Sequence, residues 1–256
     1  VQQHCIAWLW DLPWRNLRSA VYDHPVLLGI NALGGIAAPQ FIMLAGVSTI
    51  LLETRHPSDA GRLRIARGSM ILGLGYLLNI LAPCWFSPAS WYVLHCIGAA
   101  YILSALLCLL PTTLLFVSAA LPFVIAVVLQ SLFETPAALG NSAMSHYETC
   151  ADGIRLVLAE GHFPLFPWLG FFIAGMACGR WIAENRYGAV GLFAAAVLLC
   201  AGLLFGLSYI DLSRFPSPVL HTALTRTSRI YPLFPPLGLL LCGIALLLLY
   251  LFLYLD

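Results

Sequence analysis

Long apolar blocks separated by short polar segments dominate the pattern of this chain. Each block approaches the roughly 20 residues that a helix needs to cross a bilayer. The blocks are built from Leu, Ala, Gly, Ile and Phe and lack the strict alternation that is typical of β-barrel strands. We therefore predict an all-α, polytopic integral membrane protein with a single transmembrane domain over residues 1–256.

Seven blocks are long enough to be complete spans, and residues 1–10 look like the end of a further helix whose beginning is missing. The predicted spans are 25–53, 67–84, 90–110, 112–132, 163–183, 188–210 and 232–255. The first of these is overlong, and Pro39 is expected to kink it or to split it in two. The sequence thus predicts about eight transmembrane helices, of which the first is truncated.

Composition supports a membrane protein and says little about partners. Hydrophobic residues make up 61% of the chain and charged residues 9%, and the mean hydropathy is +0.91. A soluble domain is closer to half apolar and a quarter charged. With a net charge of +1 and no basic stripe, nothing indicates nucleic acid binding. We expect the lipid bilayer, and a homo-oligomer or a larger membrane complex, as partners.

The arginines set the expected orientation, since the chain contains no lysine. The densest cluster lies in and beside loop 54–66 and consists of Arg55, Arg62, Arg64 and Arg67. By the positive-inside rule this loop is cytoplasmic, which places the acidic loop 133–162 outside. Loop 211–231 disagrees, because it is basic on the outer side; either it hides a re-entrant segment or its arginines bind an anion. We expect a multi-pass protein of the bacterial cytoplasmic membrane.

Five polar side chains from five predicted helices fall at one outer depth, as a cavity opening outward would require: His4, Asn31, Asn79, His95 and His162. Polar residues inside a membrane are costly and often functional. The alternative is that each simply bonds to a neighbouring helix, a contact worth about 0.6 kcal/mol. For the two asparagines both interpretations stay open. His95 fits packing slightly better, and His162 fits a helix-capping residue as well as a site residue.

Arg62, Arg64 and Arg67 gather on the other side of the membrane, and Arg180 follows a run of small residues toward the same side. A guanidinium matches a phosphate bidentately, so this group could bind the phosphates of a cytosolic donor. The simpler interpretation is that these arginines only set the topology. The GxxxG from Gly175 to Gly179 favours close helix packing over chemistry.

The cysteines and tryptophans are assigned structural roles. Cys96, Cys108, Cys178, Cys200 and Cys242 lie in apolar spans and are expected to be small packing residues. Cys84 and Cys150 fall on the predicted outer side, where pairing remains open. No metal-binding spacing is present in the sequence, so no metal is predicted. The tryptophans at predicted span ends are expected to form an aromatic belt: Trp85, Trp91, Trp168 and Trp181.

Several segments resemble, in order, those of the heparan-α-glucosaminide N-acetyltransferase-like transmembrane acyltransferases. The most specific is residues 163–180, FPLFPWLGFFIAGMACGR. Residues 38–52, 67–79 and 91–107 look like the second, third and fourth helices of the family, and QQHCIAWLW looks like the end of its first. The resemblance is strongest over residues 1–185.

The resemblance implies a membrane-embedded acyltransferase that moves an acyl group from cytosolic acyl-CoA to a sugar or similar acceptor on the outer side. It implies that His4 is the acyl-transfer histidine. Because the histidines share one depth, we further predict that His95 and His162 assist His4 near the acceptor, and that acyl-CoA binds against Arg62, Arg64, Arg67 and Arg180 on the other side. The alternative is a non-catalytic scaffold subunit of a larger membrane complex, because fold does not fix function. A transporter ranks third, since no second half repeats the first.

Overall fold

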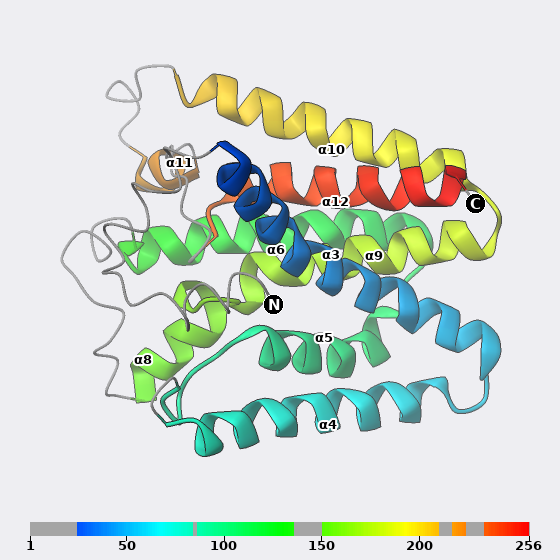
Figure 1. Ribbon diagram of the computed structural model, residues 1–256, viewed down its shortest axis with the longest axis horizontal. Helices are drawn as coiled ribbons and strands as arrows, with labels where there is room; N and C mark the ends of the chain where they lie inside the picture. The colour runs from blue at the N-terminus through cyan, green and yellow to red at the C-terminus, as the bar shows by residue number, and fades with distance from the viewer. Residues whose placement is uncertain (1–24, 84–85, 136–149, 210–216, 224–232, 256) are drawn as a thin grey trace.

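The computed structural model describes residues 25–83, 86–135, 150–209, 217–223 and 233–255, with side chains from residue 34 onward except those of residues 150–152, 220 and 222–223. Every element in these ranges is a helix (Figure 1). The elements are α3 (Pro25–Arg55), α4 (Ala60–Leu81), α5 (Val93–Leu107), α6 (Thr112–Leu132), α8 (Cys150–Arg155), the π-helix η1 (Leu156–Glu160), α9 (Leu165–Ala183), α10 (Tyr187–Leu207), α11 (Pro218–Ala223) and α12 (Pro235–Leu255).

The seven complete predicted spans correspond to seven of these helices, which confirms the all-α polytopic class. Within the described residues, five helices are long and apolar enough to cross a membrane: Gly34–Arg55, Thr112–Leu132, Leu165–Ala183, Tyr187–Leu207 and Pro235–Leu255. Helix α5 is apolar but has only 15 residues, and α4 carries arginines in its first turns. Residues 1–10 lie outside the described residues, so the count of about eight remains a prediction. Pro39 does not split α3, which is one continuous helix.

The bundle has two ends, which we name by their polar residues. At the arginine end, defined by Arg64 and Arg180, short connections join α3 to α4, α5 to α6, and α9 to α10 (Figure 1). At the histidine end, defined by His95 and His162, lie the short helices α8 and α11 (Figure 1). Helices α3, α5, α9 and α12 run from the histidine end to the arginine end, and α4, α6 and α10 run back.

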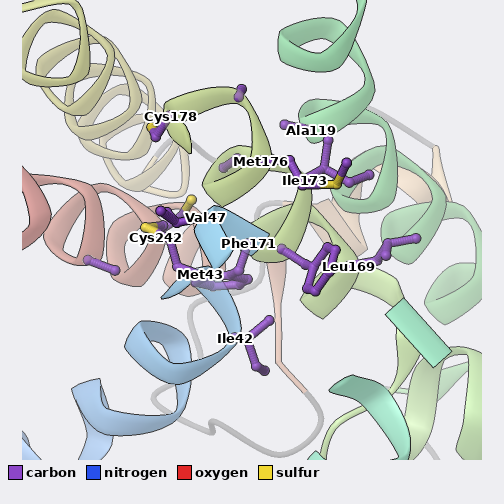
Figure 2. Close-up of a cluster of buried hydrophobic side chains, with 14 of the residues drawn as sticks. Ile42, Met43, Val47, Ala119, Leu169, Phe171, Ile173, Met176, Cys178 and Cys242 are labelled. Carbon is purple, nitrogen blue, oxygen red and sulfur yellow. The ribbon is translucent and has the colours of Figure 1, made fainter. Parts of the chain in front are cut away.

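Helix α9 is the core of the bundle, packed between α3 and α6. In its most apolar stretch 72% of the residues are buried, against 17% in α10. Glycines bring its backbone against α3: a Cβ added at Gly175 would lie 2.0 Å from the carbonyl oxygen of Met43. Figure 2 shows Met43 and Val47 of α3 beside Met176 of α9 in this core. The Gly175–Gly179 motif is therefore a helix-packing motif, as its spacing indicated.

Two helix pairs flank this core, and their outer faces are apolar. Helix α4 packs on α5 where Gly68 and Gly98 meet, and α10 packs on α12. Large apolar side chains on the outside of these pairs are exposed, among them Ile80, Leu106 and Leu199. Exposed leucine is costly in water but not against lipid tails, which are equally apolar. The outer surface is thus that of a protein embedded in a bilayer.

The prediction of an aromatic belt was wrong for two tryptophans. Trp168 is fully buried, with its ring 4.8 Å from that of Phe163 and 5.1 Å from that of Phe171, and Trp91 is also buried. Both stand near helix ends, where a belt residue would stand, but they face the protein interior. Position along a helix does not reveal which way a side chain points. Trp85 lies outside the described residues.

Candidate functional site

His95 stands in the first turn of α5 and is almost fully buried, with 1% of its surface exposed. Its Nδ1 accepts a hydrogen bond from the backbone N–H of Tyr92 (3.1 Å). Since Nδ1 is an acceptor, the neutral ring carries its proton on Nε2. The ring lies against the backbone of α4, where a Cβ on Gly75 would come within 3.0 Å. His95 therefore caps α5 and can act as an Nε2–H donor rather than as a base.

Asn79, in the last turn of α4, lies beside His95, with its Nδ2 3.5 Å from Nε2 of that ring. The same Nδ2 donates to the carbonyl oxygens of Ser90 (2.8 Å) and Pro88 (3.4 Å). These bonds tie the end of α4 to the turn before α5. Between the two interpretations of Asn79, the geometry favours the structural one.

His162 lies between η1 and α9, at the mouth of α9. Its ring stacks on that of Tyr92, with centroids 5.0 Å apart. The next carbonyl, of Phe163, accepts a hydrogen bond from Nε1 of Trp91 (3.0 Å). Burial lowers the pKa of His162, which favours the neutral imidazole near physiological pH. His95 and His162 thus share one neighbour, because the first binds the Tyr92 backbone and the second stacks on its ring.

A charged clamp precedes His162, and sequence reasoning missed it. The carboxylate of Glu160 is 2% exposed and accepts hydrogen bonds from Nε and Nη2 of Arg155 (both 2.8 Å) and from Oγ1 of Thr135 (2.8 Å). Arg155 also donates to the carbonyl oxygen of Phe133 (2.9 Å). The clamp joins the chain after α6 to the chain before α9. Its only signal in the sequence is one arginine in an acidic loop.

The structure brings His95 and His162 to one end, but it does not place the whole predicted cluster. His4 and the side chain of Asn31 lie outside the described residues, as do Cys84 and the side chain of Cys150. The arginines of the basic loop 211–231 lie outside them too. For these residues the sequence-based hypotheses stay predictions.

At the arginine end, Arg64 is 4% exposed and lies between α4 and α3. Its Nη2 donates to the carbonyl oxygen of Thr49 (3.1 Å) and to Oε2 of Glu53 (3.0 Å). Its Nε is buried and has no hydrogen-bond partner. The Nη2 group of this guanidinium is therefore hydrogen-bonded to α3, while the Nε–H group donates no hydrogen bond.

Arg180 anchors the end of α9 to the turn between α5 and α6. Its guanidinium donates to the carbonyl oxygens of Cys108 (2.7 Å) and Leu110, and Nη1 lies 3.5 Å from Oγ1 of Thr112. Carbonyl oxygens left without partners at the end of α5 are satisfied in this way. Arg180 thus has a structural role whatever else it binds.

Cys108 links the two arginines electrostatically. Its buried thiol lies within electrostatic reach of Glu53, Arg64 and Arg180. Beside this group is an open cleft of about 260 Å³, lined by Ile50, Glu53, Thr54, Arg180, Ala183 and Glu184.

The four arginines predicted as one group are divided by the structure. Arg64 and Arg180 lie near Cys108, whereas Arg62 and Arg67 are exposed on the first turns of α4. The helix begins at Ala60, inside the segment that the sequence marked as a loop. Positions two residues apart on a helix point in nearly opposite directions, which separates Arg62 from Arg64. Arg67 lies one turn further along the face of Arg64 and is exposed there. The same stretch therefore supplies one internal and two external cations.

A comparison with known protein families gives a match over most of the chain. The sequence model of the family described as "Heparan-alpha-glucosaminide N-acetyltransferase, catalytic" matches residues 8–190. The match covers α3 to α9 and includes His95, His162 and all four arginines, but it begins after His4. Neither a curated protein nor a solved structure matches this chain. On the match over residues 8–190, the chain belongs to the heparan-α-glucosaminide N-acetyltransferase catalytic family.

Proposed function

We propose that this protein is a membrane-embedded acyltransferase that moves an acyl group from acyl-CoA, bound at the arginine end, to a sugar or similar acceptor at the histidine end. The observation that carries the proposal is the family match over residues 8–190. The positive-inside rule supports a cytoplasmic arginine end, where acyl-CoA is available. The product leaves on the opposite side.

Donor binding is supported by the cations of the arginine end. Arg62 and Arg67 are exposed there and are free of the internal contacts that hold Arg64 and Arg180. Guanidinium groups bind phosphate oxygens through two parallel hydrogen bonds, so these two arginines suit the outer phosphates of a donor. The cleft beside Arg180 offers a place for a further part of the same molecule.

Acyl transfer needs a group that accepts a proton and one that holds the acceptor. His162, neutral through burial, suits a base. His95, whose Nδ1 is engaged by Tyr92, suits a donor that positions an oxygen through Nε2–H. His4 keeps the role of acyl-transfer histidine that the family resemblance implied. A neutral imidazole suits transient acyl transfer at physiological pH.

The first test is acetyl transfer by the purified chain in lipid nanodiscs. Isotope-labelled acetyl-CoA is supplied with methyl α-D-glucosaminide, and the N-acetylated product is measured by mass spectrometry. We expect product with the folded chain and none with the heat-denatured chain. Replacing Arg62 and Arg67 by alanine should raise the KM for acetyl-CoA, whereas Arg186→Ala, an exposed arginine paired with Glu184, should not. Folded protein that transfers no acetyl group would favour the scaffold alternative.

The role of His4 has a test of its own. His4→Ala should abolish transfer while circular dichroism and gel filtration report an intact fold. His56→Ala is the matched control, because His56 is exposed in the α3–α4 connection at the arginine end. If His4→Ala keeps its turnover and replacement of another histidine abolishes it, that other histidine is the acyl-transfer residue and His4 is not.

A further inference from the structure

Glu53 occupies a position between the cleft of the arginine end and the buried Arg64. Its side chain lines the cleft and is 45% exposed, and its carboxylate pairs with Nη2 of Arg64 at 3.0 Å. Arg64 itself does not line the cleft and is 4% exposed. If the Glu53 side chain rotated away, the cleft would extend to the guanidinium of Arg64.

Arg64 is not saturated by its present partners. Both of its hydrogen bonds leave from Nη2, to Glu53 and to the carbonyl oxygen of Thr49, while Nε is buried without a partner. A buried N–H group without a partner costs about 1–3 kcal/mol, and more when it is charged. A ligand with several acceptor oxygens on one atom would satisfy Nε and replace the contact with Glu53.

A second guanidinium stands at the same place. Arg180 lines the cleft, and its bonds to the turn after α5 hold it in position. These bonds use three of its five N–H groups at most, so donors remain for a ligand. Glu53 connects the two cations, because it lines the same cleft as Arg180 and pairs with Arg64 at 3.0 Å.

We propose that the Glu53 carboxylate is a placeholder for a phosphate group, which displaces it from Arg64 and binds between Arg64 and Arg180. The inference rests on the proposed function in naming the phosphate of an acyl-CoA donor as the occupant. A phosphate on an anionic lipid headgroup has the same chemistry. In either case the Glu53 side chain rotates away from Arg64 when the anion binds, which links anion binding to the breaking of the Glu53–Arg64 ion pair.

The test measures binding of coenzyme A to the full chain in phosphatidylcholine nanodiscs. Glu53→Gln keeps the shape of the side chain but removes its charge and its ion pair. We expect it to bind coenzyme A about tenfold or more tightly, because like charges placed together in a site are strongly unfavourable. Arg64→Lys keeps the charge but loses the planar edge, and it should weaken binding about tenfold. Glu184→Gln is the matched control, since Glu184 lines the same cleft but pairs with Arg186.

The control separates a specific exchange from simple electrostatics. Equal tightening by Glu53→Gln and Glu184→Gln, or none by either, would overturn the proposal. Tightening confined to Glu53→Gln, with weakening in Arg64→Lys, supports it. The binding result for Arg64→Lys is used only if gel filtration shows that this variant is folded. If it is not folded, the comparison of Glu53→Gln with Glu184→Gln decides whether the proposal holds.

Two further arms identify the source of the phosphate and separate this inference from the proposed function. Binding of inorganic pyrophosphate is measured in the same variants. Retention of phosphatidylglycerol by these variants is measured by native mass spectrometry. If the substitutions change the binding of coenzyme A and of pyrophosphate, the occupant is a soluble donor. If they change only the retention of phosphatidylglycerol, the phosphate site exists and its occupant is a lipid. If the substitutions change the binding of none of the three ligands, the phosphate site is contradicted, even if the wild-type chain transfers acetyl groups. Conversely, a pyrophosphate response in a chain without transfer upholds the site and counts against the acyltransferase.

Discussion

Gly175→Ala is the substitution that most directly tests how the bundle is held together. The added Cβ would lie 2.0 Å from the carbonyl oxygen of Met43, and real Cβ atoms essentially never come within 3.0 Å of such an atom. Helices α3 and α9 must therefore move apart by about 1 Å where they cross, in an interior that is close-packed. Overpacking of this kind costs about 1–3 kcal/mol. Alanine favours the helix over glycine by about 0.5–1 kcal/mol, which offsets part of this cost. We therefore expect the free energy of unfolding to fall by about 1–2 kcal/mol in total.

The matched control is Gly202→Ala on the outer face of α10, where an added Cβ meets nothing within 4 Å. It should be neutral or stabilising by about 0.5–1 kcal/mol, because only the helix propensity changes. The free energy of unfolding of both variants is measured by titration with SDS in mixed micelles, followed by far-ultraviolet circular dichroism. If Gly175→Ala proves as stable as Gly202→Ala, the close contact between α3 and α9 does not exist as described.

Three further predictions concern the histidine end. Arg155→Ala removes the guanidinium that donates two hydrogen bonds to the buried carboxylate of Glu160 and should lower the free energy of unfolding by about 3 kcal/mol in the same titration; a change below the measurement error would contradict the clamp. Because burial lowers the pKa of His162 below its ordinary 6.5, the unfolded chain binds a proton more readily, so stability should fall as the pH drops below 6.5. That fall should be smaller in His162→Gln when melting temperatures are compared from pH 8 to pH 5, and identical pH profiles would refute it. Trp91→Phe loses the hydrogen bond to the carbonyl oxygen of Phe163 and should cost about 1 kcal/mol, whereas an unchanged unfolding midpoint would show that the bond is not formed.

The fold could be predicted to the extent that the bilayer dictates it. A helix must be long and apolar to cross the membrane, so the seven apolar blocks marked the positions of seven helices, and five of these are long and apolar enough to span a bilayer. The start of α4 was placed too late because Arg62 and Arg64 were assigned to a loop. The charge of Arg64 is accommodated in the helix by Glu53 on α3, a pairing between helices that the sequence does not display. The short α8 and η1 were missed because helices of six and five residues leave no apolar block.

The candidate site shows the same limit more sharply. Depth along a helix placed His95 and His162 at one end, because the rise per residue is fixed. Their common neighbour Tyr92, and hence the tautomer of His95, follow from rotation about helix axes and from a contact between residues far apart in the chain. For the same reason the arginines of α4 were predicted as one group although Arg62 and Arg64 face opposite ways with respect to the protein.

Acyl transfer from one side of a membrane to the other is measured directly in proteoliposomes. The purified chain is reconstituted with methyl α-D-glucosaminide sealed inside and isotope-labelled acetyl-CoA supplied outside, to which the bilayer is impermeable. Vesicles in which the arginine end faces outward should accumulate labelled N-acetylglucosaminide in the lumen, and protein-free vesicles should not. Protein that is folded in the vesicles but leaves the lumenal sugar unlabelled, with acetyl-CoA intact outside, would contradict acyl transfer across the membrane.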